Sequence, residues 1–101
     1  MIDSRIYLEE IYESEEHGTT TLYFIAPKEM LDGKYPNAEH TEICIEFPTN
    51  KPEAHYSSVR FSPSRYDEEK QAFTDYDWYD VEMSYEDIEA LIELAERRNQ
   101  K

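Results

Sequence analysis

The sequence predicts a single α+β domain spanning residues 1–101, with a mostly antiparallel sheet of four to five strands and a C-terminal amphipathic helix packed on it. Three observations support this fold class. Several short segments are rich in β-branched and aromatic residues, turn-forming residues separate them, and one segment near the end has helical periodicity. A chain of 101 residues is the usual size of one domain. This order of elements is typical of an α+β domain.

The first segment, Arg5–Glu13, fits neither the helical nor the strand period cleanly, so either structure is possible for it. Glu15–Gly18 is a turn signal that ends in glycine. Thr19–Ala26 is rich in β-branched and aromatic residues and predicts a strand. A strand directly after a short turn favours a β-hairpin, and therefore favours a strand for the first segment.

The middle of the chain predicts two strands between loops. Pro27–Asn37 contains two prolines and a glycine, which indicates a loop. The next strand has the clearest alternation in the chain, with Thr41, Ile43, Ile45 and Phe47 on one face and Glu42, Cys44 and Glu46 on the other. A further strand follows with Val59 and Phe61 toward the core, and with Ser58, Arg60 and Ser62 on the outer face.

The last third of the chain predicts a loop, a long strand and a helix. Pro63–Lys70 is polar and predicts a loop, and Phe73–Met83 predicts a final long strand. Ser84 is a favourable N-cap for the helix that follows. Acidic residues occupy its first turn and arginines its last, as the helix dipole favours. The apolar residues of this helix recur at the spacing of one buried face: Ile88, Leu91, Ile92 and Ala95.

The charge of the chain is its strongest functional signal. The formal net charge is -14, whereas a small soluble domain usually carries a net charge of magnitude about 2–8. So large a negative charge repels nucleic acid and anionic membranes, and it attracts basic proteins and speeds encounter with them. Solubility alone, or adaptation to high salt, would also account for an acidic composition.

The acidic residues are concentrated toward the two ends of the chain. No lysine or arginine occurs between Lys70 and Arg97, an interval that contains nine acidic residues. The predicted hairpin adds five glutamates against Arg5, so the two acidic regions could merge on one side of the fold. In a continuous strand, residues two apart share a face about 7 Å from each other. Asp75 and Asp77 would then share one face, and Asp80 and Glu82 the opposite face.

Such rows of carboxylates could imitate the phosphates of a nucleic acid. Two aromatic residues lie among them, since Tyr76 and Trp78 would share a face while Tyr79, Val81 and Met83 point to the core. Tyrosine and tryptophan are enriched at interface hot spots and accept cation–π contacts from arginine. Trp78 could instead be a core residue covered by the helix or a loop. The predicted partner-binding residues are Asp75, Tyr76, Asp77, Trp78, Asp80, Glu82, Glu86, Asp87 and Glu89.

Other chemistry is less well supported by the sequence. Cys44 is the single cysteine, which excludes an internal disulfide and a cysteine-based zinc site. Asp75, Asp77 and Asp80 lack the glycine that an EF-hand calcium loop needs at its sixth position, and a strand is expected there. We find no arrangement typical of a nucleophile with its base, and therefore predict neither an enzyme nor a bound cofactor or metal. The N-terminus does not resemble a signal peptide and no apolar run could span a membrane, so we expect a cytoplasmic protein.

In length, charge and lack of catalytic motifs the chain resembles the small acidic inhibitors of phages and mobile elements, in particular anti-CRISPR proteins that mimic DNA. The residues that carry this resemblance are the segment 75–80 and the acidic helix from Ser84 to Glu96. The resemblance implies an inhibitor that occupies the nucleic-acid site of a basic protein, such as an RNA-guided nuclease, and binds no nucleic acid itself. Two alternatives stay open: an immunity or antitoxin protein that caps a basic toxin nuclease, and a protein-interaction module without mimicry.

Overall fold

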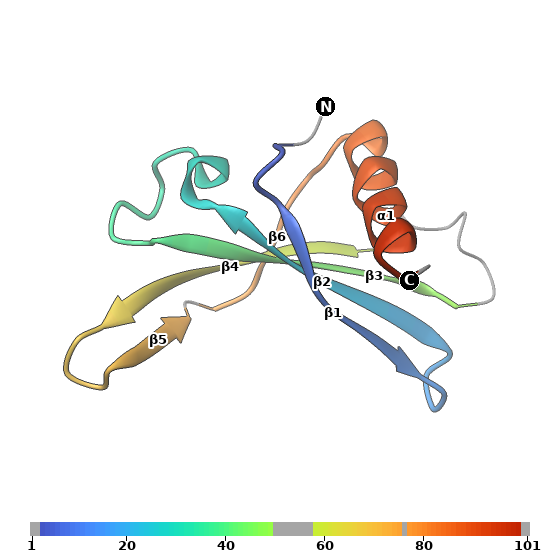
Figure 1. The fold of residues 1–101 in the computed structure, drawn as a ribbon, viewed down its shortest axis with the longest axis horizontal. Helices are drawn as coiled ribbons and strands as arrows, with labels where there is room; N and C mark the ends of the chain where they lie inside the picture. The colour runs from blue at the N-terminus through green and yellow to red at the C-terminus, as the bar shows by residue number, and fades with distance from the viewer. Residues whose placement is uncertain (1–2, 50–57, 76, 100–101) are drawn as a thin grey trace.

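The computed structural model describes residues 3–49, 58–75 and 77–99, and it has the predicted α+β architecture (Figure 1). One antiparallel sheet is packed against a C-terminal helix, which confirms the fold class. The elements in chain order are β1 (Tyr7–Ser14), β2 (Thr19–Pro27), the 3-10 helix η1 (Lys28–Leu31), β3 (His40–Pro48), β4 (Ser58–Asp67), β5 (Ala72–Asp75), β6 (Tyr79–Asp80) and α1 (Tyr85–Asn99).

The sheet is a meander in which each strand pairs with its neighbour in the chain, in the order β1-β2-β3-β4-β5. The short strand β6 pairs with β4 on the same side as β5, but nearer the start of β4. Figure 1 shows α1 and η1 on the same side of the sheet. We call this side the core face and the other side the outer face. The core face contributes buried residues such as Leu22, Phe24, Ile43 and Ile45 to the hydrophobic core.

The N-terminal segment is a strand, and a β-bulge explains why its pattern was ambiguous. Leu8 pairs with Phe24 and Glu10 pairs with Tyr23, so Glu9 is an extra residue in β1. The insertion shifts the alternation by one position, because side chains on a strand alternate with a period of two. Leu8 and Ile11 are three residues apart and yet both pack against the core. The sequence therefore shows neither a clean strand period nor a helical one.

The predicted loop over Pro63–Lys70 is wrong for its first half, because β4 continues to Asp67. Pro63 is a fully buried residue of this strand and pairs with Thr41 of β3. A proline cannot donate a ladder hydrogen bond and is confined to edges and irregular positions of a sheet. On the other side of β4, β6 pairs with Arg60 and Phe61, and the pairing with β5 starts at Ser64. Pro63 thus lies where the ladder is interrupted, and its missing N–H is tolerated there.

The predicted long strand Phe73–Met83 is also wrong, because it is divided into β5 and β6. Three residues separate Asp75 from Tyr79, whereas two residues separate their partners Ser64 and Phe61. The extra residue reverses the alternation, as in a bulge. Positions 75 and 80 pair with Ser64 and Arg60, which lie on one face of β4. The alternation expected of one continuous strand over Phe73–Met83 therefore does not hold.

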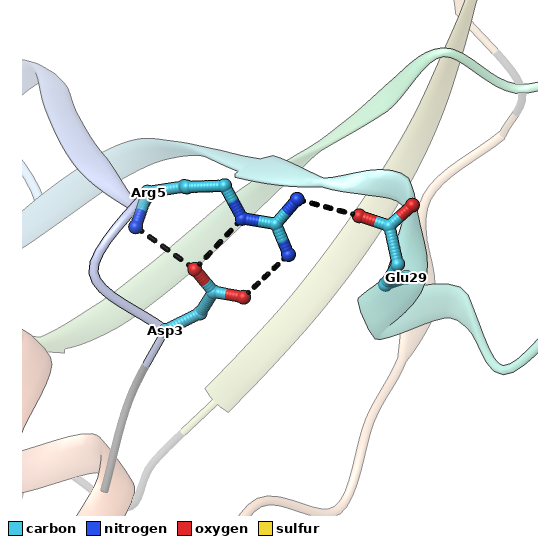
Figure 2. Close-up of polar contacts among 3 residues, drawn as sticks. All are labelled: Asp3, Arg5 and Glu29. Carbon is cyan, nitrogen blue, oxygen red and sulfur yellow. Dashed lines mark hydrogen bonds and ion pairs between the residues drawn. The ribbon is translucent and has the colours of Figure 1, made fainter.

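The predicted loop Pro27–Asn37 contains η1, and this segment closes one end of the core. Leu31 of η1 and Ala38, directly after the predicted loop, are both buried in the core. Figure 2 shows how Arg5, just before β1, is tied to η1. Its guanidinium donates from Nη1 to Glu29 Oε1 at 2.9 Å and from Nη2 to Asp3 Oδ2 at 2.8 Å. The start of β1 is thereby linked to an element 24 residues away in the chain.

The helix α1 begins as predicted. The Oγ of Ser84 accepts a hydrogen bond from the backbone N–H of Asp87 at 3.2 Å, which is the N-cap contact. The four predicted apolar residues of α1, Ile88, Leu91, Ile92 and Ala95, are all buried in the core. Val81 and Met83, which precede the helix, pack against the same core as predicted. No helix within the described residues is long and apolar enough to cross a membrane.

Candidate functional site

The outer face carries a row of side chains that crosses five strands. Glu10 of β1 pairs with Tyr23, Tyr23 with Cys44, Cys44 with Arg60, and Arg60 with Asp80 of β6. Directly opposed residues in an antiparallel sheet have Cβ atoms about 4.5–5.5 Å apart. The row therefore places an aromatic ring and a thiol at its centre and a carboxylate at each end.

Two further carboxylates flank this row. Glu42 and Glu46 precede and follow Cys44 by two residues on β3, so all three lie on the outer face. Tyr23 and Cys44 are partly buried, Glu42 is partly buried and Glu46 is exposed. The residues between them on β3, Ile43 and Ile45, point to the core, so their side chains do not occupy the outer face. The result is a cluster of carboxylates around a partly buried centre.

Trp78 joins this cluster through Tyr23. The two rings meet edge to face, with centroids 6.4 Å apart and an interplanar angle of 60°. The neighbouring Tyr79 points the other way, where its ring stacks on Tyr35 at 5.7 Å and meets Phe61 at 6.1 Å. Since successive residues of an extended chain point to opposite faces, Tyr79 in the core directs Trp78 outward. Trp78 is 42% exposed, and of the two sequence-based interpretations the surface position is therefore the correct one.

The electrostatics of the centre reflect the surrounding carboxylates. Burial raises the pKa of the Tyr23 hydroxyl, and Cys44, Glu10, Glu46 and Glu42 raise it further. Burial likewise raises the pKa of the Cys44 thiol, with Glu46 and Glu42 acting in the same direction and Arg60 in the opposite one. Ionising either group would add a negative charge beside negative charges. Burial and the neighbouring carboxylates thus favour the uncharged forms of the Tyr23 hydroxyl and the Cys44 thiol.

We call this set the outer-face patch. It comprises Glu10, Tyr23, Glu42, Cys44, Glu46, Arg60, Trp78 and Asp80. Four of these residues are acidic and one is basic, and Arg60 Nε lies 3.3 Å from Asp80 Oδ1. That ion pair is exposed, so it contributes about 0–1 kcal/mol and is easily exchanged for another. An exposed ring, Trp78, and a partly buried one, Tyr23, lie beside carboxylates and suit a lysine or arginine side chain, through cation–π contact and charge-assisted hydrogen bonds.

The structure divides the residues predicted from the sequence between two surfaces. Trp78 and Asp80 belong to the outer-face patch, while Asp77 and Glu82 are exposed in the segments on either side of β6. The helical residues Glu86, Asp87 and Glu89 lie on α1, across the sheet from the patch. Asp75 is described by its backbone position opposite Ser64, and Tyr76 lies outside the described residues. The predicted set therefore does not form one continuous surface.

A second acidic surface lies along α1. Four exposed glutamates recur at intervals of three and four residues and so form one stripe, which we call the helix stripe: Glu86, Glu89, Glu93 and Glu96. Glu13 of the β1–β2 hairpin lines the same groove as Glu96. The groove thus brings one acidic residue of the hairpin, Glu13, beside one of the helix, Glu96, whereas Glu10 of the hairpin lies on the outer face.

Sequence reasoning missed most of the outer-face patch, including Glu10, Tyr23, Glu42 and Glu46. A signal was present, because glutamates alternate with Cys44 on the clearest predicted strand. Their place beside Tyr23 depends on the register of β2 against β3, which the alternation alone does not give.

Two findings bear on other chemistry. Within residues 3–49, 58–75 and 77–99, no group of three or more His, Cys, Asp or Glu side chains is arranged to hold a metal ion. A cavity of about 420 Å³ beside η1 is lined by Lys28, Glu29, Gly33, Tyr35 and Pro36. None of these described lining residues is a serine, cysteine or histidine that could form a nucleophile–base pair.

The comparisons with known proteins leave the site to be interpreted from its own chemistry. No protein-family model matches the chain, and neither a curated protein nor a solved structure matches it significantly.

Proposed function

We propose that this protein binds a basic nucleic-acid-binding protein through the outer-face patch and thereby blocks the partner's DNA or RNA site. The observation that carries the proposal is the composition of the patch. Four carboxylates surround two aromatic rings on the sheet face opposite α1. A partner that binds phosphates through arginine and lysine side chains would bind these carboxylates and aromatic faces instead of the phosphates.

The charge of the whole chain supports this proposal. At a net charge of -14 the protein repels nucleic acid and attracts basic surfaces over a distance set by screening, roughly 8 Å at physiological salt. Arg5, Arg60 and Arg97, three of its basic side chains, are already paired with carboxylates of the same chain. Inhibition by occupancy follows from the same electrostatics, because a site that binds phosphates cannot hold this protein and a nucleic acid together.

A competition experiment tests the proposal. The protein is immobilised, used to capture partners from a nuclease-treated lysate of its source cell, and each captured protein is purified. Fluorescence anisotropy then follows a labelled duplex DNA or RNA bound to that partner while this protein is added. We expect the nucleic acid to be released as the protein binds. A ternary complex that keeps the nucleic acid fully bound would contradict the proposal.

Two charge-matched variants locate the surface. Glu10→Gln with Glu46→Gln removes two charges from the outer-face patch, and Glu68→Gln with Glu69→Gln removes two from the exposed segment between β4 and β5. We expect the first variant to lose competition about five- to fiftyfold, since charges beside a desolvated anchor are worth more than isolated ones. The second variant should lose less than threefold. Equal losses would mean diffuse attraction by net charge, without a defined patch.

The single tryptophan and the single cysteine report directly on the patch. Partner binding there should change the fluorescence of Trp78 and protect Cys44 from alkylation by a maleimide. The same assays also examine the immunity-protein alternative, in which the captured partner is a toxin nuclease and release of nucleic acid is accompanied by loss of cleavage.

A further inference from the structure

A small apolar groove lies between the C-terminal half of α1 and the strands β1 to β3, on the core side of the sheet. Its volume is about 130 Å³. The buried residues that line it include Leu22, Phe47 and Ile92, and two exposed glutamates, Glu13 and Glu96, line it as well. The groove therefore combines an apolar wall with two carboxylates, and it is separate from the outer-face patch.

Both carboxylates are available to a ligand. In the part of the chain that the structure describes, neither Glu13 nor Glu96 belongs to an ion pair. Glu96 also lies in the last turn of α1, where the helix dipole places partial negative charge. Arg97 lies next to it in the chain but pairs with Glu93 at 3.5 Å. The groove is thus negative at its opening and favours a cation.

The size of the groove limits what can enter it. An engineered protein cavity of about 150 Å³ lined by leucine, isoleucine and phenylalanine binds one benzene molecule. A groove of about 130 Å³ can take one side chain of similar bulk, but not a helix or a strand. Lysine and arginine bury their methylene stems against apolar surfaces while the charged group stays at the surface. Such a side chain matches the apolar wall and the two carboxylates together.

We propose that this groove binds one lysine or arginine side chain of a partner protein, with the stem against Leu22, Phe47 and Ile92 and the cationic group between Glu13 and Glu96. This inference rests on the proposed function, because a basic partner would present that side chain. It adds a second contact point on the opposite side of the sheet from the outer-face patch. A partner that contacts both sites would have to extend around the edge strand β1, from one side of the sheet to the other.

The test needs no natural partner. The ¹⁵N- and methyl-labelled protein is titrated with the capped peptide acetyl-Gly-Lys-Gly-amide, and with acetyl-Gly-norleucine-Gly-amide as an uncharged peptide of the same stem length. We expect saturable chemical-shift changes at Ile92, Ala95 and Leu22 with the lysine peptide, and weaker binding of the norleucine peptide. Equal affinity of the two peptides would overturn the proposal, since the carboxylates would then contribute nothing.

Charge-matched variants separate a defined site from general attraction. Glu13→Gln with Glu96→Gln should weaken binding at the groove about three- to tenfold, the effect of two exposed ion pairs. Glu15→Gln with Glu16→Gln removes the same charge from the hairpin turn and should leave this affinity within about twofold. Similar weakening by both double variants would overturn the proposal of a defined binding site in the groove. Shifts at Tyr23 and Cys44 report the outer-face patch independently, so failure of one site does not imply failure of the other.

Discussion

At the scale of single residues, the contact between Asp3 and Arg5 has a measurable signature (Figure 2). The side-chain hydrogen bond from Arg5, together with its backbone N–H, lowers the pKa of Asp3 to about 2. A carboxylate with a depressed pKa contributes stability above its unfolded pKa, about 3.9, and loses it as the pH falls through the folded value. We predict that ¹³C NMR titration of Asp3 has its midpoint near pH 2. In Arg5→Gln the midpoint should return toward the ordinary range, and an unchanged midpoint would assign the shift to another group.

The reactivity of Cys44 tests the electrostatics of the outer-face patch. Burial, and then Glu46, raise the pKa of this thiol, while Arg60 lowers it. We predict that Glu46→Gln increases the rate of reaction with a disulfide reagent at pH 8 about two- to fivefold, because more of the thiol is ionised. Arg60→Gln should decrease that rate by a similar factor. The measurement is the reaction rate as a function of pH for each folded variant. Superimposable profiles would contradict the assignment of Glu46 and Arg60 as groups that shift the pKa of the thiol.

At the scale of secondary-structure elements, the N-cap of α1 offers a clear stability test. The Oγ of Ser84 satisfies the backbone N–H of Asp87. We predict that Ser84→Ala lowers the free energy of unfolding by about 1 kcal/mol, the usual effect of losing such a cap. Ser84→Asp should retain most of the stability, because its carboxylate can accept the same bond and is favoured by the helix dipole. Urea denaturation followed by circular dichroism measures both, and equal losses in the two variants would mean that the hydroxyl is not a cap.

The elements that were predicted correctly depend on local pattern, and those that were not depend on the neighbouring strand. The helix was predictable because Ser84 and its apolar spacing are local signals. Pro63 was misleading, since a proline is acceptable in β4 only where the ladder to β5 and β6 is interrupted. The acidic segment was placed on one strand because nothing local marks the extra residue between β5 and β6. Trp78 was recognised as a candidate, but its partner Tyr23 lies 55 residues away and is brought near only by the sheet.

At the scale of the whole molecule, the net charge of -14 acts on stability and on binding in opposite directions. Self-repulsion of like charges destabilises the compact state, and added salt screens it. We predict that raising sodium chloride from about 0.02 to 0.5 M increases the melting temperature. The same change should weaken binding to the basic partner by at least about tenfold, because attraction between exposed charges is screened as well. Thermal unfolding by circular dichroism and binding by anisotropy measure the two effects. Affinity that stays constant over this range would contradict electrostatic recognition.

The division of the last strand has a consequence for how firmly the two halves of the outer-face patch are held. Tyr23 and Cys44 lie in the long strands β2 and β3, which pair over nine positions. Trp78 immediately precedes β6, which has two residues and is supported by two pairings with β4 and by the bond from the Val81 N–H to the Val59 carbonyl. Short, weakly paired segments open with little free energy and exchange their amide hydrogens early. In hydrogen–deuterium exchange we expect Tyr79–Val81 to exchange well before residues 20–26 and 41–47. The tryptophan edge of the patch would then adjust to a bound surface, and protection of that segment would mark the moment of contact.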